Sequence, residues 1–380
     1  MTLVAAGTMV LDDQVCKPGW LATSAGRIVE CGPGPAPRPP DHDFANYIVV
    51  PGFVDMHVHG GGGASYTDGI SSEIEQAAEF HRRHGTTTTV ASLVTASPDD
   101  LLRQVRVLAE MTRQKTVAGV HLEGPWLSAA RCGAHDSTLL RKPDSAEIDA
   151  LLAAADGTIR MVTLAPELPG SQDAIARLAD ADVIVAIGHT DASYDDAKRA
   201  IELGATVGTH VFNGMRPLHH RDPGPALALL EDPRVTVELI ADGVHVHPAL
   251  VRQVIETVGF GRVALITDAM AAAGLSDGPF RIGALEVEVT ERIARVRGTS
   301  TIAGSTATMD QIFRTAVGQL GGSDEALAKA ARMTATTPAR ALNLDRVGSL
   351  RVGMDANCVV LDKDLHVKRM MLNGSWLPHR

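Results

Sequence analysis

The central part of the chain alternates short apolar runs with stretches of helical periodicity. Residues 72–85 (SEIEQAAEFHRRHG) are typical of an amphipathic helix, with Ile74, Ala77 and Ala78 on one face and a glycine stop. The apolar runs are rich in β-branched residues and lie at 49–59, 86–94, 117–124, 159–167, 183–190, 206–213, 235–243 and 263–270. Apolar strands that alternate with helices indicate a parallel sheet covered on both faces. We therefore predict an α/β fold, and eight such units favour a closed (β/α)8 TIM-like barrel over an open doubly wound sheet.

The two ends of the chain have a different pattern. Residues 1–48 and 347–380 contain short strand-like segments separated by turn residues, and neither end is long enough for a core of its own. We expect the two ends to form one small β-sandwich module together. The barrel would then occupy residues 49–346, with a β-hairpin insertion near 280–298.

Composition and charge exclude several classes of protein. The 380 residues are 45% hydrophobic and 21% charged, which is enough for a large core, and the formal net charge is −10. An acidic chain without clustered Lys and Arg is not expected to bind nucleic acid, although local cations could still hold a small anionic substrate. No apolar run reaches the length of a membrane span, and the start lacks the basic region of a signal peptide. The four cysteines form no C-x-x-C pair, so we expect a cytoplasmic protein.

Polar residues gather where five of the predicted strands end. These side chains are His57 and His59 at the end of the first strand, then Glu123, His189, His210 and Asp268. In a parallel barrel all strand C-termini open on one face, so these side chains are expected to meet in a single mouth. Imidazoles and carboxylates are the usual ligands of Zn²⁺ and other first-row divalent ions.

The alternative is that these are ordinary core residues. A lone buried His is more often hydrogen-bonded in a core than bound to a metal. Five strand ends that all carry a suitable ligand are much harder to explain by packing, and we therefore predict a metal site. Five other histidines lack this placement and are expected on the surface or on helix faces: His81, His84, His219, His220 and His366.

Several sequence motifs together resemble those of a known protein family. They are PGFVDMHVHG, HLEGPW, GHTDASYDDAKRAIELGA, THVFNGM, ADGVHVHP, TDAM and AGSTATM. The set resembles the amidohydrolase superfamily and, more narrowly, the family of N-acetylglucosamine-6-phosphate deacetylases. The resemblance covers roughly residues 50–340 and implies a metal-dependent hydrolase. Such an enzyme removes the acetyl group from a phosphorylated amino sugar and releases acetate and glucosamine 6-phosphate, as in amino-sugar catabolism or cell-wall recycling.

The resemblance also implies roles for the residues at the strand ends. One or two divalent ions, with Zn²⁺ as the first candidate and other first-row ions as alternatives, would be held by His57, His59, Glu123, His189, His210 and Asp268. The chain keeps both histidines of the H-x-H pair, which favours two ions. No strand-end Lys suited to carboxylation is present, so Glu123 would take the bridging place. Asp268 would move the proton between water and the leaving amine, and His135 would contact the substrate near its carbonyl group.

Further residues are expected to bind the substrate. By resemblance they are Ala134, His135, Asn213, Gly214, His245, Ile302, Ala303 and Gly304, together with Arg221. In this family the corresponding Arg reaches across a dimer interface to the phosphate, so a homodimer is expected. Cys132 lies between Glu123 and His135, where a thiol could approach the metal, and it is a candidate modulator of that loop.

Two other functions compete with this interpretation. The chain could be an amidohydrolase that acts on a cyclic amide, as dihydroorotases do, but HLEGP without a metal-bridging Lys argues against it. It could also be a non-catalytic barrel that serves as a scaffold. Such a protein would be expected to have lost ligands, whereas the set here is intact.

Overall fold

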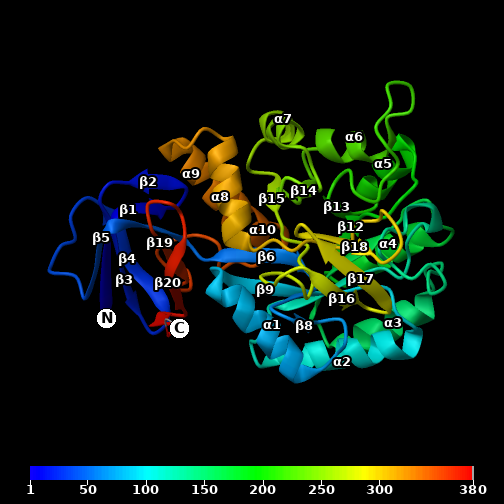
Figure 1. The fold of residues 1–380 in the computed structure, drawn as a ribbon, viewed down its shortest axis with the longest axis horizontal. Helices are drawn as coiled ribbons and strands as arrows, with labels where there is room; N and C mark the ends of the chain where they lie inside the picture. Colours follow the sequence, from blue (N-terminus) through cyan, green and yellow to red (C-terminus); the bar gives the residue numbers. More distant parts are fainter. Residues whose placement is uncertain (379–380) are drawn as a thin grey trace. The chain divides into compact units, whose positions relative to one another are not determined.

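The structure is a computed structural model that describes residues 1–378; the last two residues of the expected 347–380 segment lie outside the described part. The chain forms two compact units (Figure 1). One contains residues 1–55, 81–88 and the chain from 309 onward, and the other contains residues 56–80 and 89–308. Helices after residue 308 therefore belong to the same unit as the chain ends, whereas the bounds predicted from the sequence include residues up to 346 in the barrel. The expected domain bounds stay a prediction.

The first unit holds a sheet built from both ends of the chain. Its strands run in the order β21-β20-β19-β5-β1-β3-β4, with β2 paired to β1. Their bounds are β1 Thr2–Leu11, β2 Gln14–Cys16, β3 Gly19–Ser24, β4 Arg27–Pro33, β5 His42–Pro51, β19 Cys358–Leu361, β20 Val367–Leu372 and β21 Ser375–Trp376. Strand β5 joins the two ends, because it pairs in parallel with β1 and antiparallel with β19. The prediction that both chain ends share one β module is confirmed.

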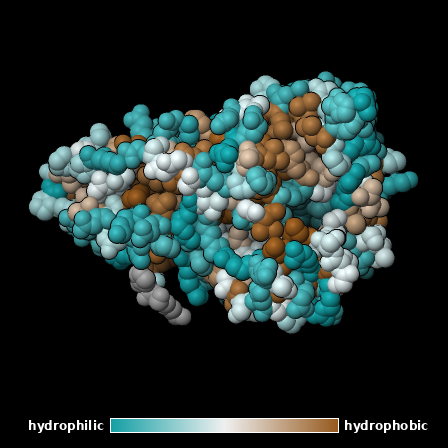
Figure 2. Space-filling model, turned by 45° about the horizontal axis from the view of Figure 1, so that its top comes forward, coloured by the Kyte–Doolittle hydropathy of each residue, from teal (hydrophilic) through white to brown (hydrophobic). Residues whose placement is uncertain are grey.

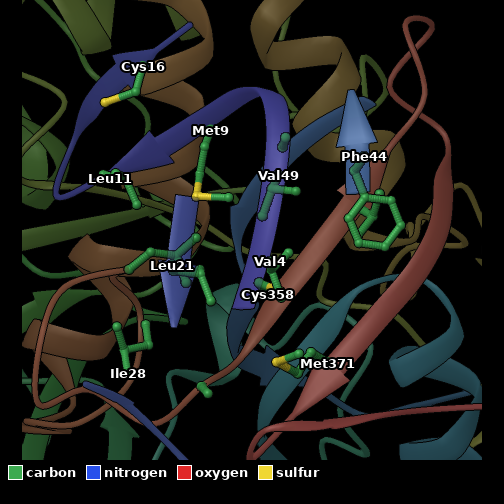
Figure 3. Close-up of a cluster of buried hydrophobic side chains, with 14 of the residues drawn as sticks. Val4, Met9, Leu11, Cys16, Leu21, Ile28, Phe44, Val49, Cys358 and Met371 are labelled. Atoms are coloured by element: carbon green, nitrogen blue, oxygen red, sulfur yellow. The ribbon is translucent and has the colours of Figure 1, made fainter. Parts of the chain in front are cut away.

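Side chains from both ends share the core of this unit. Figure 3 shows Val4, Met9 and Leu21 from the start of the chain beside Cys358 and Met371 from its end, and all five are buried. Burial raises the pKa of the Cys358 thiol to about 12, so this sulfur is a packed apolar group rather than a nucleophile. Neither chain end could bury these residues without the other.

The second sheet contains the eight predicted parallel strands. They are β6 Phe53–Val58, β9 Thr86–Leu93, β10 Gly119–Glu123, β11 Ile159–Leu164, β12 Ile184–Ile187, β13 Ala205–Gly208, β14 Thr236–Leu239 and β15 Val263–Leu265. Each lies within or against one of the eight apolar runs, and each pairs with the next in chain order. Backbone hydrogen bonds join the two ends of this path, from Asp268 N to His57 O (2.9 Å) and from His59 N to Ala269 O (2.8 Å). The predicted eight-stranded barrel is confirmed.

Helices follow most of these strands, as the periodicity predicts. They are α1 Ser71–Arg83, α2 Pro98–Arg113, α3 Ser145–Ala155, α4 Ser171–Asp180, α5 Tyr194–Glu202, α6 Gly224–Glu231, α7 Pro248–Val258, α8 Met309–Gln319, α9 Asp324–Ala331 and α10 Thr337–Ala341, with a 3-10 turn at Ala129–Arg131 and a π-helical turn at Arg332–Thr336. Local sequence fixes several starts. Ser193 and Asp196 form a reciprocal capping box at α5, and the Asp144 carboxylate accepts two backbone N–H groups at α3.

A small antiparallel sheet follows the last barrel strand. It consists of β16 Gly278–Ile282, β17 Leu285–Thr290 and β18 Ile293–Val296, in the region where the sequence suggests a hairpin. Its apolar face packs with Val94, Met270 and Ala303 in one buried cluster. The insertion therefore has a core of its own beside the strand ends. A short pair, β7 Gly60–Gly61 and β8 Ala64–Ser65, follows β6.

The face of the molecule drawn in Figure 2 is mostly polar. Figure 2 shows hydrophilic residues over most of the face in view, with hydrophobic ones in smaller areas between them. Large exposed apolar side chains such as Val29, Ile70 and Val352 are far apart in the sequence. Among the described residues, no helix combines the length and the apolar character needed to cross a bilayer.

Candidate metal centre and active site

The backbone turns sharply at three of the strand ends that carry candidate ligands. His189, His210 and Asp268 follow β12, β13 and β15, and their φ angles are +47°, +26° and +48°. Residues other than glycine rarely adopt this left-handed conformation, and such strain concentrates at functional sites. Glu123 instead ends β10 directly, and His57 lies within β6. The turns bring the side chains of five different strand ends to one place.

Two pairs of histidines face each other through their Nε2 atoms. His57 Nε2 lies 3.2 Å from His59 Nε2, and Asp268 Oδ1 lies 3.5 and 3.2 Å from these two atoms. On the other side, His189 Nε2 lies 3.2 Å from His210 Nε2. All five side chains are buried. These distances define two adjacent groups of inward-facing donor atoms.

Glu123 lies between the two groups. Its Oε1 is 3.1 Å from His189 Nε2 and 2.9 Å from His210 Nε2. Its Oε2 is 3.2 Å from His59 Nε2 and 3.4 Å from the Nε2 of His135. The structure thus brings all the expected ligands together, with Glu123 between the two pairs of histidines.

Hydrogen bonds on the far side of the rings set the tautomers. His59 Nδ1 lies 3.2 Å from the Ser92 carbonyl oxygen, and His189 Nδ1 lies 2.9 Å from the Arg131 carbonyl oxygen. A carbonyl can only accept, so in both rings Nδ1 carries a hydrogen, and Nε2 is the nitrogen that can present a lone pair to a cation. Lone pairs and carboxylates that converge in a buried place repel one another unless protons or a metal ion lie among them. The nitrogen and oxygen donors, and the acceptors behind them, fit a divalent first-row ion.

Comparison with known proteins supports this conclusion. The sequence pattern of the amidohydrolase family matches residues 48–377. The chain belongs to the amidohydrolase family.

Within this family, the chain is similar to deacetylases of phosphorylated amino sugars. The chain is 36% identical to an N-acetylgalactosamine-6-phosphate deacetylase of Escherichia coli O157:H7, over 86% of this chain and 87% of the relative. It is 37% identical to an N-acetylglucosamine-6-phosphate deacetylase of Bos taurus, over 87% and 84%. A mutant N-acetyl-D-glucosamine-6-phosphate deacetylase of Mycobacterium smegmatis, solved with N-acetyl-D-glucosamine-6-phosphate, is 52% identical. It has a TM-score of 0.97 over 99% of this chain and 98% of that one.

The charges of the amidohydrolase site stabilise each other strongly. Burial disfavours charge on His57 and His59, but neighbouring carboxylates outweigh it and raise both pKa values, that of His59 to about 9. Burial likewise opposes the Asp268 carboxylate, but the facing His57 and His59 lower its pKa to about 2. The pKa of Glu123 is held well below its usual range, because His57 and His189 outweigh burial. Asp268 is therefore a carboxylate at neutral pH and can accept a proton.

His135 differs from the candidate ligands. Burial lowers the pKa of His135 to about 4, so its ring is neutral. The Thr95 backbone N–H donates to His135 Nδ1 (3.2 Å), which makes Nδ1 the acceptor. The hydrogen must then be on Nε2, the atom that faces Glu123 and the cavity. Nε2 of His135 is thus a hydrogen-bond donor, whereas Nε2 of His59 and of His189 is the nitrogen available to a cation.

A cavity of about 320 Å³ opens over the cluster. Most of the expected substrate-binding residues line it: Ala134, His135, Asn213, Gly214, His245, Ile302 and Gly304. Ala303 does not, because it is fully buried behind the wall, in the core of the β16–β18 insertion. We expect Ala303 to contact the substrate through its backbone, and this contact stays a prediction. Val94 and Ile282 form part of the wall and were not foreseen.

Two expected residues lie outside the cavity of their own chain. Arg221 is exposed, and its guanidinium lies 2.8 Å from Nε2 of His220. Cys132 is half-buried, and its thiol contacts only the Gly133 carbonyl oxygen, at 3.9 Å, among the printed polar contacts of the described residues. Neither takes part in the cluster as the structure stands.

Other histidines mostly follow expectation. His219, His220 and His366 are exposed, and His84 is partly exposed and lies 3.0 Å from Asp310. His81 is different, because it is fully buried on the inner face of α1. It therefore lies on a helix face, one of the two places expected for it, and its i+7 position in the apolar stripe accounts for its burial.

Sequence reasoning missed Glu238 and Asp242. Glu238 is fully buried in β14, and its Oε2 lies 3.1 Å from His57 Nδ1. Asp242 follows the same strand, and its Oδ2 lies 2.7 Å from His245 Nδ1. A carboxylate in the middle of the apolar run 235–243 was the available signal for Glu238, since burying a charge is costly unless it is paired.

Proposed function

We propose that this amidohydrolase removes the N-acetyl group of N-acetylglucosamine 6-phosphate, giving glucosamine 6-phosphate and acetate. The observation that carries the proposal is the buried cluster of histidines and carboxylates at the floor of a cavity lined by the substrate-contact residues expected of this deacetylase family. The relatives that cover most of the chain are deacetylases of phosphorylated amino sugars. The intact cluster argues against a non-catalytic scaffold. A cyclic-amide hydrolase has no comparable support.

The cluster suits the hydrolysis of an unreactive amide. A divalent ion supplies a polarised carbonyl group and a water whose pKa falls from 15.7 to about 7. His57, His59 and Asp268 would hold it on one side, and His189 and His210 on the other, with Glu123 shared between two positions. We favour Zn²⁺ and two positions, because both histidines of the H-x-H pair and the bridging carboxylate are in place.

Asp268 would transfer the proton, and His135 would donate a hydrogen bond to the carbonyl oxygen of the amide. Asp268 is a carboxylate beside His57 and His59, so it can take a proton from the attacking water and pass it to the leaving amine. His135 is neutral with its hydrogen on Nε2, so it can donate to the oxygen of the amide as charge develops there. The two residues have opposite proton states, as acid and base roles require.

The phosphate would lie toward Asn213 and Gly214, where backbone N–H groups can approach it. Arg221 lies outside its own cavity and is exposed, which supports the expectation that it serves the site of a neighbouring subunit in a homodimer. His245, held by Asp242, faces the same cavity. The free cysteines agree with a reducing, cytoplasmic location.

A second substrate deserves a direct test. The Escherichia coli relative is a deacetylase of N-acetylgalactosamine 6-phosphate, which differs from the glucose sugar only in the configuration at C4. The contacts that we assign lie around the amide and the phosphate and do not by themselves separate the two epimers. We therefore rank the glucose epimer first, on the structural similarity to the Mycobacterium smegmatis deacetylase.

The test is acetate release by protein of measured metal content. Both 6-phosphosugars and unphosphorylated N-acetylglucosamine are compared, and the Asp268→Asn variant is the control for contaminating activity. We expect kcat/KM to be highest for N-acetylglucosamine 6-phosphate and strongly reduced without the phosphate. No acetate release above the Asp268→Asn control from any of the three would refute the proposal.

A further inference from the structure

Glu238 is a buried carboxylate that contacts both halves of the cluster. It lies in β14 with no solvent exposure. Its Oε2 accepts a hydrogen bond from His57 Nδ1 (3.1 Å) and another from the His210 backbone N–H (3.1 Å). The backbone carbonyl of Glu238 also accepts from Val211 N (2.9 Å). One residue therefore contacts the ring of His57 and the backbone turn that carries His210.

Packing alone does not account for a carboxylate at this position. The neighbouring residues Val237 and Leu239 are fully buried and apolar, and an apolar side chain at 238 would avoid the cost of burying a charge. Its other oxygen, Oε1, has no hydrogen-bond partner among the described residues. The cost is compensated only on the side that faces His57 and His210.

His57 also differs from His59 and His189 in the group that accepts the hydrogen bond from its Nδ1. His59 and His189 donate to neutral backbone carbonyls, from Ser92 and Arg131, whereas His57 donates to a carboxylate. A charged acceptor makes a stronger hydrogen bond and raises the basicity of the opposite ring nitrogen. The same oxygen also holds the backbone of His210, whose φ of +26° needs support from its surroundings.

We propose that Glu238 is a positioning residue of the metal centre. It orients His57 and fixes the turn of His210, and it thereby sets how tightly the centre holds its divalent ion. The proposal rests on the metal centre of the proposed function, but it does not depend on which substrate is hydrolysed.

The test measures zinc affinity rather than turnover. Zinc-loaded full-length protein is equilibrated with increasing concentrations of a chelator, and the bound zinc is counted. We expect Glu238→Leu to bind zinc about 10–100-fold more weakly, which is the usual effect of losing a partner behind a metal-binding His. Glu238→Gln keeps an acceptor oxygen but loses the charge, so it should lie between Glu238→Leu and the unchanged protein. With Co²⁺ in place of Zn²⁺, both variants should shift the visible absorption bands of the ion.

Asp310→Asn is the matched control. Asp310 is also a buried carboxylate that contacts a His Nδ1, that of His84 (3.0 Å), but this pair belongs to the other compact unit. Asp310→Asn should lower the thermal stability of the protein while its zinc affinity and Co²⁺ bands stay unchanged.

Three results would overturn the proposal. They are unchanged zinc affinity in Glu238→Leu, an equal loss of affinity in Asp310→Asn, or, should Glu238→Leu fail to fold, unchanged affinity and Co²⁺ bands in Glu238→Gln. The deacetylase assay is independent of these measurements. Weak zinc binding by Glu238→Leu would support the positioning role even if the phosphosugar were not hydrolysed.

Discussion

A methyl group added at Gly214 should weaken metal binding through His189. Gly214 has a φ of +59°, and a Cβ built on it would lie 2.9 Å from His189 Nδ1 and 3.1 Å from its Cε1. Real Cβ atoms essentially never come within 3.0 Å, so the imidazole or the loop must move. The displaced atom is the one that donates to the Arg131 carbonyl at 2.9 Å. Gly214→Ala should therefore disturb the hydrogen bond that orients the His189 ring with Nε2 toward the cluster.

The expected effect has two parts. A left-handed backbone costs a residue with a Cβ roughly 1–2 kcal/mol, which lowers the free energy of unfolding. The disturbed His189 should separately weaken zinc binding by about 10-fold or more, as for other losses behind a metal-binding His. Gly133→Ala should act in the same direction but less strongly, because its Cβ would lie 3.0 Å from His189 Cε1.

Gly157→Ala separates the two parts. Gly157 has a similar φ of +77°, but a Cβ there meets no heavy atom within 4 Å. Unfolding in urea should show a similar loss of stability for Gly157→Ala and for the backbone part of Gly214→Ala. Chelator competition should show weakened zinc binding only for Gly214→Ala. If Gly214→Ala and Gly157→Ala bind zinc equally well, the contact with His189 does not control the metal centre.

Other predictions follow from individual contacts. Asp268→Asn should lower kcat by about 10² to 10⁴ with little change in substrate binding, and near-normal turnover would remove it from the mechanism. Zinc analysis should give about two ions per chain, falling toward one in His59→Gln; equal values would contradict a two-metal centre. Arg221→Ala should raise KM by the equivalent of about 1.5–3 kcal/mol, and mixing its subunits with Asp268→Asn subunits should restore some activity if sites are shared. Hydrogen bonds from Arg234 lower the pKa of Asp232, so the stability it adds is present above the unfolded value near 3.9 and is lost below it. The difference in unfolding free energy between the natural protein and Asp232→Asn should therefore shrink from pH 5 to pH 3; a constant difference would contradict this.

The barrel could be predicted because the apolar runs in the sequence match the burial that a parallel sheet covered on both faces requires. Parallel strands covered on both faces need apolar residues throughout, so each run in the sequence stands out, and polar residues at its end are conspicuous. The module of the chain ends is harder. Its strands are visible as short alternating segments, but the parallel pairing of β1 with β5 depends on contacts between distant residues, which local patterns do not contain.

The candidate metal ligands could be predicted from the sequence, but the groups that hydrogen-bond to them could not. His57, Glu123 and Asp268 stand at strand ends, so geometry alone gathers them. The carbonyl of Arg131 behind His189 carries no sequence signal, because every residue has a carbonyl group. Glu238 stood out as a carboxylate in an apolar strand. Its role could not be predicted, because the sequence does not show that its partner is His57.

The partner behind each imidazole ring distinguishes the roles of residues that look alike in the sequence. A backbone carbonyl behind His59 fixes a hydrogen on Nδ1 and leaves Nε2 available to a cation, whereas a backbone N–H behind His135 leaves a donor toward the cavity. His245 has a carboxylate behind it. Burial opposes its charged form, but Asp242 at 2.7 Å outweighs burial and raises the pKa of His245 above 6.5. Its Nδ1 donates to Asp242, so in the protonated ring Nε2 also carries a hydrogen. Unlike neutral His135, His245 can therefore offer a positively charged donor to an anionic substrate in the cavity.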